Sequence, residues 1–109
     1  MRPDPGDVLR STDPFKLGTE VQRPWLVVST DRHPFADEQF VAVAVSTKKY
    51  PESVPLPAED WTVGGVPEES FAAPWAVHSP RVEDVLAWQG RVTDDVLDRV
   101  TDELVDYLW

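Results

Sequence analysis

The chain has 109 residues, enough for one domain with a modest core, and 41% of them are apolar, which favours a folded protein over a disordered one. It has no cysteine, which excludes disulfides and thiolate metal sites, and no apolar run of the roughly 18 residues that a membrane span needs. Twenty acids against ten lysines and arginines give a net charge of −10. The first residues lack a signal-peptide pattern, so we expect a cytoplasmic protein.

The charge is unevenly divided along the chain. Residues 1–50 hold seven basic and seven acidic residues, whereas residues 51–109 hold three basic and 13 acidic ones, a net charge of −10. An anionic ligand would therefore meet the first half of the chain. The acidity fits either a surface adapted to a high-salt cytoplasm, as in haloarchaeal proteins, or a mimic of nucleic acid that binds a basic partner. The acids are dispersed rather than run together, which favours the halophilic interpretation.

The first half of the chain reads as strands separated by polar loops. Residues 8–10 begin an extended run, and residues 11–22 carry turn-forming residues that predict a loop of about a dozen residues. Residues 24–29 combine β-branched and aromatic side chains and predict a strand. Residues 30–38 form a second polar loop, and residues 40–46 alternate large with small side chains, which predicts a strand with one buried face.

The second half continues the pattern with shorter elements. Residues 53–56 predict an edge strand, where proline is tolerated, and residues 57–69 predict a turn-rich connection. Residues 70–78 predict a strand interrupted by a proline. Residues 81–92 predict a short turn or helix followed by a short strand at 88–92.

The last segment predicts a helix. Thr93 is a candidate N-cap, and two acids follow it where the helix dipole favours negative charge. Apolar residues recur at spacings of three and four and form one stripe: Val96, Leu97, Val100, Leu104, Val105 and Leu108. Several short strands with one terminal helix predict a mainly β fold. We expect a single domain over residues 1–109, with a strongly bent antiparallel sheet or SH3-like barrel closed at one opening by the helix.

The sequence offers no metal-binding or cofactor-binding motif. Its two histidines, His33 and His78, stand in neither an HxH nor an HExxH pattern, and no Gly-rich phosphate loop is present. An enzyme built from this chain is therefore expected to work without metal or cofactor. RNA cleavage by the ribose 2′-oxygen fits this limit, because the protein need only accept one proton, donate another and stabilise charge on the phosphate.

Five residues are candidates for such chemistry. Glu20 and Arg23 lie three residues apart before a predicted strand, and a planar guanidinium can hold two phosphate oxygens. The same spacing is typical of a surface ion pair. Ser46 and Thr47 end a predicted strand, where a hydroxyl can form a turn or bind a phosphate oxygen. His78 fits a proton carrier and a structural residue equally well.

Other residues are candidates for binding RNA rather than cleaving it. The basic ones are Lys16, Lys48 and Lys49. Trp25 is the aromatic candidate, because an exposed ring near basic residues can stack on an unpaired base. Packing in the core or at a sheet edge is the ordinary alternative for Trp25 and Tyr50.

The order of several short motifs resembles that of one known family. Residues 6–9, Gly-Asp-Val-Leu, resemble the opening strand of MazF/PemK toxins, and residues 18–24, Gly-Thr-Glu-Val-Gln-Arg-Pro, resemble their Gly-Ser-Glu…Arg-Pro loop. The strand at 26–29 follows in the same place. Residues 43–47, Val-Ala-Val-Ser-Thr, resemble a Val-Pro-x-Thr-Thr/Ser strand end, and residues 90–100 resemble the start of the last helix.

This resemblance implies a fold, an activity and partners. The fold is an SH3-like barrel of the CcdB/PemK type with a C-terminal helix, in a homodimer. The activity is metal-independent cleavage of single-stranded RNA, opposed by an antitoxin that covers the RNA groove. Arg23 matches the family's phosphate ligand, Glu20 matches its loop glutamate, and Ser46 falls where the catalytic threonine usually lies, with Thr47 beside it.

Two departures leave other functions open. The family's Asp-Gln pair before a basic residue corresponds here to Pro74–His78, which has no acid, and His78 stands near the basic position. The loop at 11–18 matches the family only partly, at residues 13–15. A catalytically inactive barrel that binds RNA or a partner peptide is therefore the second hypothesis. An acidic scaffold or nucleic-acid mimic is the third.

Overall fold

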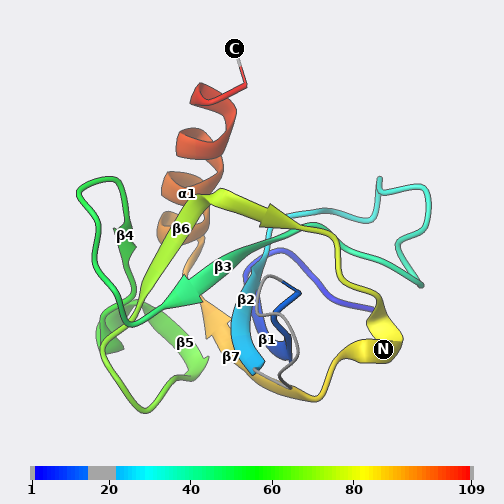
Figure 1. The fold of residues 1–109 in the computed structure, drawn as a ribbon, viewed down its shortest axis with the longest axis horizontal. Helices are drawn as coiled ribbons and strands as arrows, with labels where there is room; N and C mark the ends of the chain where they lie inside the picture. Colours follow the sequence, from blue (N-terminus) through cyan, green and yellow to red (C-terminus); the bar gives the residue numbers. More distant parts are fainter. Residues whose placement is uncertain (1, 15–21, 109) are drawn as a thin grey trace.

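The main feature of the computed structural model is an antiparallel sheet of seven strands (Figure 1). The structure describes residues 2–14 and 22–108. The strands are β1 (Asp7–Thr12), β2 (Gln22–Val27), β3 (Ala42–Ser46), β4 (Val54–Pro55), β5 (Trp61–Gly64), β6 (Phe71–His78) and β7 (Ala87–Val92). Their order across the sheet is β4-β6-β3-β2-β1-β7-β5, so the hairpin of β1 and β2 lies near the middle.

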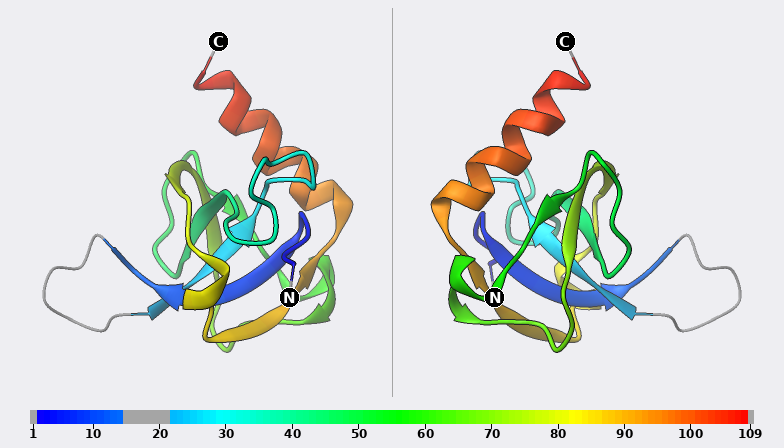
Figure 2. Two further views of the ribbon diagram at one scale, coloured as in Figure 1. Left: turned by 90° about the vertical axis from the view of Figure 1, so that its right-hand side faces the viewer. Right: turned by 90° about the vertical axis from the view of Figure 1, so that its left-hand side faces the viewer.

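Irregular pairing bends this sheet. The register shifts in the β1–β7 pair between Val8 and Leu9, and in the β3–β6 pair between Val43 and Ala44. A bulge increases the local twist and bends the strand that carries it. The sheet consequently curls into a half-barrel rather than lying flat, and the two side views in Figure 2 show the strands crossing at steep angles.

Alternation along the strands fills both sides of the curved sheet. Leu26 faces a cluster that includes Val43, whereas its neighbours Trp25 and Val27 face a second cluster around Phe40. The helix α1 (Asp94–Asp106) covers the first cluster with fully buried side chains. The second cluster lies on the other side, where residues 82 and 85 pack against it.

The helix is confirmed where it packs on the sheet and differs from the sequence prediction beyond it. The hydroxyl of Thr93 accepts a hydrogen bond from the Val96 N–H at 3.4 Å, as expected of an N-cap. Val96 and Val100 are buried, but Val105 is 46% exposed and Leu108 is 67% exposed. The predicted stripe is therefore wrong in its last turns, because the helix extends past the strands that could cover it (Figure 1).

The strands match the sequence prediction except in two places. The expected loop at 11–22 is too long, because β1 continues to Thr12 and β2 begins at Gln22. The expected turn-rich connection at 57–69 contains a 3-10 turn at Ala58–Asp60 and the strand β5, which pairs with β7. The other 3-10 turn, Val82–Asp84, precedes β7 as expected. No helix in the described residues is long and apolar enough to cross a membrane.

Candidate functional site

A cleft of about 790 Å³ opens where β2, β3 and β6 meet the end of the helix. Its lining is small and apolar at the sheet and charged or aromatic around it: Arg23, Ala44, Ser46, Lys48, Tyr50, Glu52, Ala73, Trp75, Ala76 and Tyr107. Arg23, Ala44 and Ser46 share one face of the sheet, because residues two apart in a strand point the same way. We refer to this depression as the Arg23 cleft.

Arg23 is oriented by a buried acid. Its Nε lies 2.8 Å from Oδ2 of Asp13, whose side chain is only 2% exposed. The alignment is that of an ion pair rather than of a linear hydrogen bond. The hairpin places the two residues together, since Ser11 pairs with Arg23 across it and Asp13 follows β1 directly. A buried carboxylate is costly without a positive partner, so the pair fixes both side chains at the cleft.

The end of β3 supplies a hydroxyl and a lysine to the same cleft. Oγ of Ser46 accepts a hydrogen bond from the Lys48 backbone N–H at 3.1 Å. Because the hydroxyl is the acceptor in this bond, its own hydrogen can be donated elsewhere, for example to a phosphate oxygen. The Lys48 ammonium lies 5.4 Å from the centre of the Tyr50 ring, which holds the charge near the cleft.

His78 is half-buried at the end of β6 and packs against Trp25. The two ring centres are 5.2 Å apart and the planes are tilted by 51°. Burial lowers the pKa of His78 below its ordinary 6.5, and the nearby Asp13 carboxylate opposes that shift. The imidazole is therefore mainly neutral at neutral pH, which suits a proton acceptor, although His78 does not line the Arg23 cleft.

The structure brings together only part of the residue set that the sequence predicts. Arg23, Ser46 and Lys48 meet in one cleft. Trp25 does not belong with them: its side chain is fully buried, so it cannot offer a ring face to RNA, and the prediction of an RNA-binding role is wrong. Packing against Leu9 and Phe40 accounts for this residue instead.

The remaining predicted residues lie at the edge of the site or outside the described part of the chain. Thr47 and Lys49 are exposed next to Ser46 and Lys48 but do not line the cleft. Glu20 and Lys16 fall within residues 15–21, which lie outside the described residues.

Sequence reasoning missed Asp13, Trp75 and Tyr107. The signal for Asp13 was its charge, opposite to that of Arg23, in the predicted loop that precedes the strand at 24–29. Trp75 adjoins a proline inside a strand, which indicates a bulge that can turn a side chain outward. Tyr107 lies just past the helix, and its place depends on tertiary packing that no local pattern encodes.

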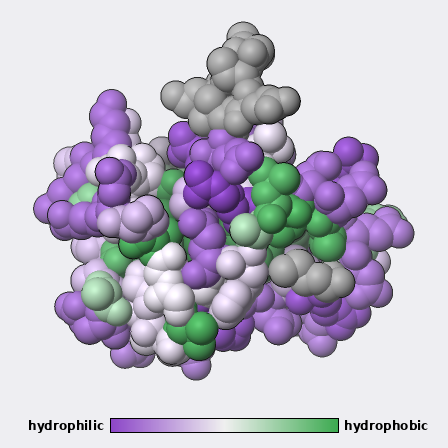
Figure 3. Space-filling model, turned by 90° about the horizontal axis from the view of Figure 1, so that it is seen from below, coloured by the Kyte–Doolittle hydropathy of each residue, from purple (hydrophilic) through white to green (hydrophobic). Residues whose placement is uncertain are grey.

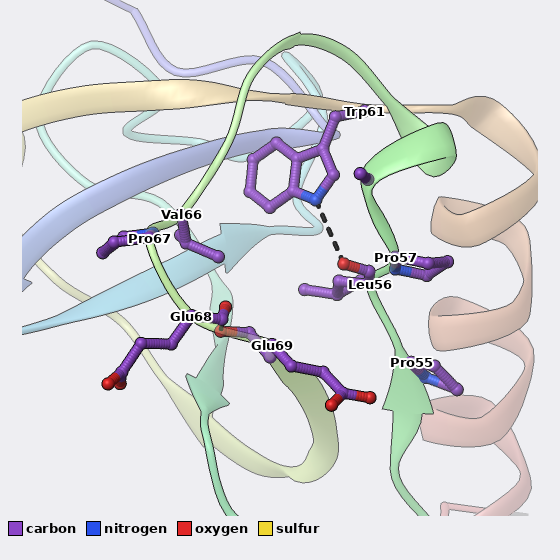
Figure 4. A pocket seen from close by; sticks show the side chains of 10 residues that line it. Pro55, Leu56, Pro57, Trp61, Val66, Pro67, Glu68 and Glu69 are labelled. Carbon is purple, nitrogen blue, oxygen red and sulfur yellow. Dashed lines mark hydrogen bonds between the residues drawn. The ribbon is translucent and has the colours of Figure 1, made fainter.

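A second pocket, of about 380 Å³, has a different character (Figure 4). Prolines, Leu56, Val66 and the indole of Trp61 surround it, and Trp61 donates a hydrogen bond from Nε1 to the Leu56 carbonyl at 3.2 Å. Its charged lining residues are Glu68 and Glu69. Without a basic side chain in its lining, this pocket is unsuited to a phosphate, and the Arg23 cleft is the better anion site.

On the underside of the molecule, the apolar side chains of the described residues are divided by hydrophilic ones. In Figure 3 the hydrophobic residues seen from below form separate patches between hydrophilic ones. Single exposed apolar residues are ordinary in folded proteins. We therefore take the Arg23 cleft as the candidate site.

The described residues form a small, mainly β half-barrel with a terminal helix and a cleft lined by Arg23 and Lys48. No protein-family model and no curated relative matches the sequence. Among solved structures, MazF (Form-I) from Deinococcus radiodurans is 25% identical, with a TM-score of 0.77 over 99% of this chain and 97% of that one.

Other solved structures agree with this match. MazE-MazF (Form-III) from Deinococcus radiodurans is 23% identical, with a TM-score of 0.79 over 99% of this chain and 97% of that one. An endoribonuclease in complex with its cognate antitoxin, from a mycobacterial species, is 22% identical, with a TM-score of 0.74 over 98% and 93%. The chain thus has a MazF-like fold, and the fold that the resemblance implied is confirmed. These bacterial matches lend no support to a haloarchaeal origin.

Proposed function

We propose that this protein is an endoribonuclease toxin of a type II toxin-antitoxin system, which cleaves single-stranded RNA such as mRNA without a metal. The observation that carries the proposal is Arg23, held at the mouth of a cleft by the buried Asp13 and accompanied there by Ser46 and Lys48. The MazF-like fold over residues 1–109, which we take as one domain, supports the same function.

In this mechanism the protein's side chains act on a phosphate that the RNA itself attacks. The ribose 2′-oxygen forms a bond to phosphorus as the bond to the 5′-oxygen breaks. The Arg23 guanidinium stabilises the added negative charge on the phosphorane, and the Ser46 hydroxyl donates a hydrogen bond to one of its oxygens. Lys48 attracts the phosphate backbone into the cleft.

Proton transfer needs one acceptor and one donor. We assign the 2′-proton to Glu20, which matches the family's loop glutamate, with His78 as the alternative, and the departing 5′-oxygen takes its proton from solvent water. The lowered pKa of His78, which follows from its burial, supports it as an acceptor, whereas its absence from the cleft lining favours Glu20. Thr47 could replace Ser46 as the hydroxyl donor.

The proposal includes partners and a place of action. One matched endoribonuclease structure contains its cognate antitoxin, so we expect an antitoxin to cover the Arg23 cleft of this chain. We also expect a homodimer, as the resemblance implies, and action in the cytoplasm, where mRNA is present. The surplus of acids fits a protein that works at high salt.

The proposal is tested by mapping cleavage of a defined RNA by primer extension, with wild type and Arg23→Ala compared in molar KCl and in EDTA. Losing the charge that stabilises the transition state should slow cleavage by about 100-fold or more. Arg32→Ala, which removes an exposed arginine from the loop after β2, serves as the matched control and should leave the rate unchanged. Cleavage by Arg23→Ala at the wild-type rate would rule the assignment out.

A second function is favoured by one observation. Pro74–His78 contains no acid where the family's Asp-Gln pair is expected, and the exposed Trp75 lies there instead. The alternative is a catalytically inactive barrel that binds RNA or a partner peptide in the same cleft. Wild-type protein that binds RNA but produces no cleavage product would favour it, as would harmless overexpression in the host.

A further inference from the structure

Two exposed aromatic rings meet in the Arg23 cleft. Trp75 is 42% exposed and Tyr50 is 40% exposed. Their ring centres are 5.6 Å apart and their planes meet at 86°, an edge-to-face contact. In this arrangement one ring presents its edge to the other, so each ring retains a face that its partner does not cover.

The backbone of β6 fixes Trp75 in this position. Val43 pairs with Val77, but the next residue of β3, Ala44, pairs with Ala73, so residues 74–76 form a bulge. Pro74 is fully buried in this bulge and has no N–H for the ladder. The strand is buried up to Pro74 and turns outward at the next residue. Trp75 is therefore held by a rigid, proline-containing bulge rather than by a loop.

Of the two rings, Trp75 is the one with a free face for a ligand. The Lys48 ammonium lies 5.4 Å from the centre of the Tyr50 ring and covers it. The cleft beside Trp75 is lined by Ala44, Ala73 and Ala76, whose small side chains leave room for a flat group. The exposed indole thus stands over open space next to the phosphate-binding residues.

The charges in the cleft favour an anionic ligand that carries such a group. The lining holds two cationic side chains, Arg23 and Lys48, and one acid, Glu52. The buried Asp13 pairs with Nε of Arg23, and the other N–H groups of a guanidinium are donors that a phosphate can accept. Every unpaired nucleotide joins a phosphate to an aromatic base, and bases stack readily on tryptophan. A peptide places a negative charge beside an aromatic ring only in particular sequences. The cationic residues and the exposed ring in the cleft therefore fit single-stranded RNA better than a peptide.

We propose that Trp75, braced by Tyr50, is a stacking platform for one unpaired base of the RNA whose backbone Arg23 and Lys48 hold. The inference rests on RNA being the ligand of the proposed function, and it adds a residue that selects unpaired over paired nucleotides. In a duplex the base faces are already stacked and cannot reach the indole. Glu52 and Tyr107 complete the lining on the side of the helix.

The test measures binding separately from cleavage. A fluorescently labelled, fully 2′-O-methylated RNA oligonucleotide lacks the attacking hydroxyl, and fluorescence anisotropy gives its affinity for wild type, Trp75→Ala, Trp75→Phe and Phe35→Ala. Phe35 is an exposed aromatic residue that does not line the cleft, which makes it the matched control. Thermal melts establish that each variant is folded.

Loss of one stacked base should weaken binding by Trp75→Ala roughly 5- to 150-fold, with most affinity kept in Trp75→Phe and all of it in Phe35→Ala. The factor by which Trp75→Ala weakens binding should be the same in low and in molar KCl, whereas the loss of affinity in Arg23→Ala should become smaller as the salt concentration rises. An oligonucleotide with abasic sites should bind wild type as weakly as the normal one binds Trp75→Ala.

Three results would overturn the inference. Equal affinity of wild type and Trp75→Ala would remove the stacking role, and so would equal affinity for normal and abasic oligonucleotides. Failure of the wild type to bind RNA at all would exclude RNA as the ligand of Trp75 and Tyr50 and would favour a protein partner. If the wild type binds but never cleaves, the proposed catalysis fails while the stacking inference stands.

Discussion

Arg23 depends on its partner more than a surface arginine would. Asp13 is almost fully buried, and its contact with Arg23 links the end of β1 to the Arg23 cleft. The other ion pairs in the described residues involve more exposed groups, such as Arg2 with Asp37, which is 79% exposed. A positioning role for Asp13 follows from this difference in burial.

Asp13→Asn should therefore lower both stability and cleavage. The change leaves a partly buried guanidinium without its counter-charge, which costs about 1–3 kcal/mol. It also loosens the orientation of Arg23, so kcat should fall by about ten-fold or more with little change in KM. Urea denaturation and steady-state cleavage measure the two effects. Asp37→Asn makes the same change in an exposed pair and should cost less than about 1 kcal/mol.

The outcome that contradicts this role is specific. If Asp13→Asn unfolds at the same urea concentration as Asp37→Asn and cleaves at the wild-type rate, the pair does not position Arg23. A loss of stability without a change in kcat would make the pair purely structural.

His78 predicts a dependence of stability on pH. Burial lowers its pKa in the folded state below the ordinary 6.5, so the unfolded chain binds the proton more readily. The contribution of the neutral imidazole is complete above pH 6.5 and is lost as the pH falls below that value toward the folded pKa. As the pH falls from 6.5 toward the folded pKa, the melting temperature of His78→Gln should therefore decrease less than that of the wild type.

The same residue reports on Asp13. The Asp13 carboxylate raises the pKa of His78 against the larger effect of burial. Asp13→Asn should consequently lower this pKa further, which NMR titration of the imidazole can follow. A pKa that rises in Asp13→Asn would show that the coupling has the opposite sign.

At the scale of elements, the backbones of β5 and β7 approach each other closely at Gly90. A Cβ added to Gly90 would lie 2.4 Å from the Val63 carbonyl oxygen, a clash with backbone that cannot move aside. Glycine at this position allows the edge strand β5 to pair with β7. The Arg23 cleft uses β2, β3 and β6 instead, so this contact supports the fold without touching the site.

Gly90→Ala should therefore destabilise the protein by about 1–3 kcal/mol or more, since overpacking forces the backbone of β5 away from β7. Urea denaturation measures the change, with Ala87→Ser as the control at an exposed position of the same strand. RNA binding per folded molecule should be unchanged. Wild-type stability in Gly90→Ala would mean that β5 is not held where the structure has it.

At the scale of the whole molecule, the sequence predicted most of the sheet because its strands alternate visibly. The β-branched run at 24–29 was sufficient to predict β2, and the alternation at 40–46 was sufficient to predict β3. β5 was missed because it is mostly exposed and owes its place to β7, whose paired residue Val92 is distant in sequence from Trp61. Non-local pairing leaves no local pattern.

The site was harder to predict, because the sequence alone does not tell a buried tryptophan in a strand from an exposed one. Trp25 and Trp75 both stand in strands, yet Trp25 is fully buried and Trp75 is exposed. The difference is set by register: the bulge at Pro74 turns Trp75 outward, whereas regular pairing keeps Trp25 in the core. Only the three-dimensional pairing decides which ring can meet a ligand.

The net charge of −10 makes salt a test of the whole molecule. Asp98, Asp102 and Asp106 lie four residues apart along α1 and are all exposed, so they repel one another at low ionic strength. Salt shortens the Debye length from about 10 Å at 0.1 M to about 3 Å at 1 M and should relieve this repulsion. The melting temperature should therefore rise with KCl.

The triple variant D98N/D102N/D106N should melt higher than wild type at low salt, and its melting temperature should rise less with KCl. A wild-type melting temperature that stays constant or falls as KCl increases would exclude an acidic surface adapted to high salt, and would favour a basic partner as the reason for the charge.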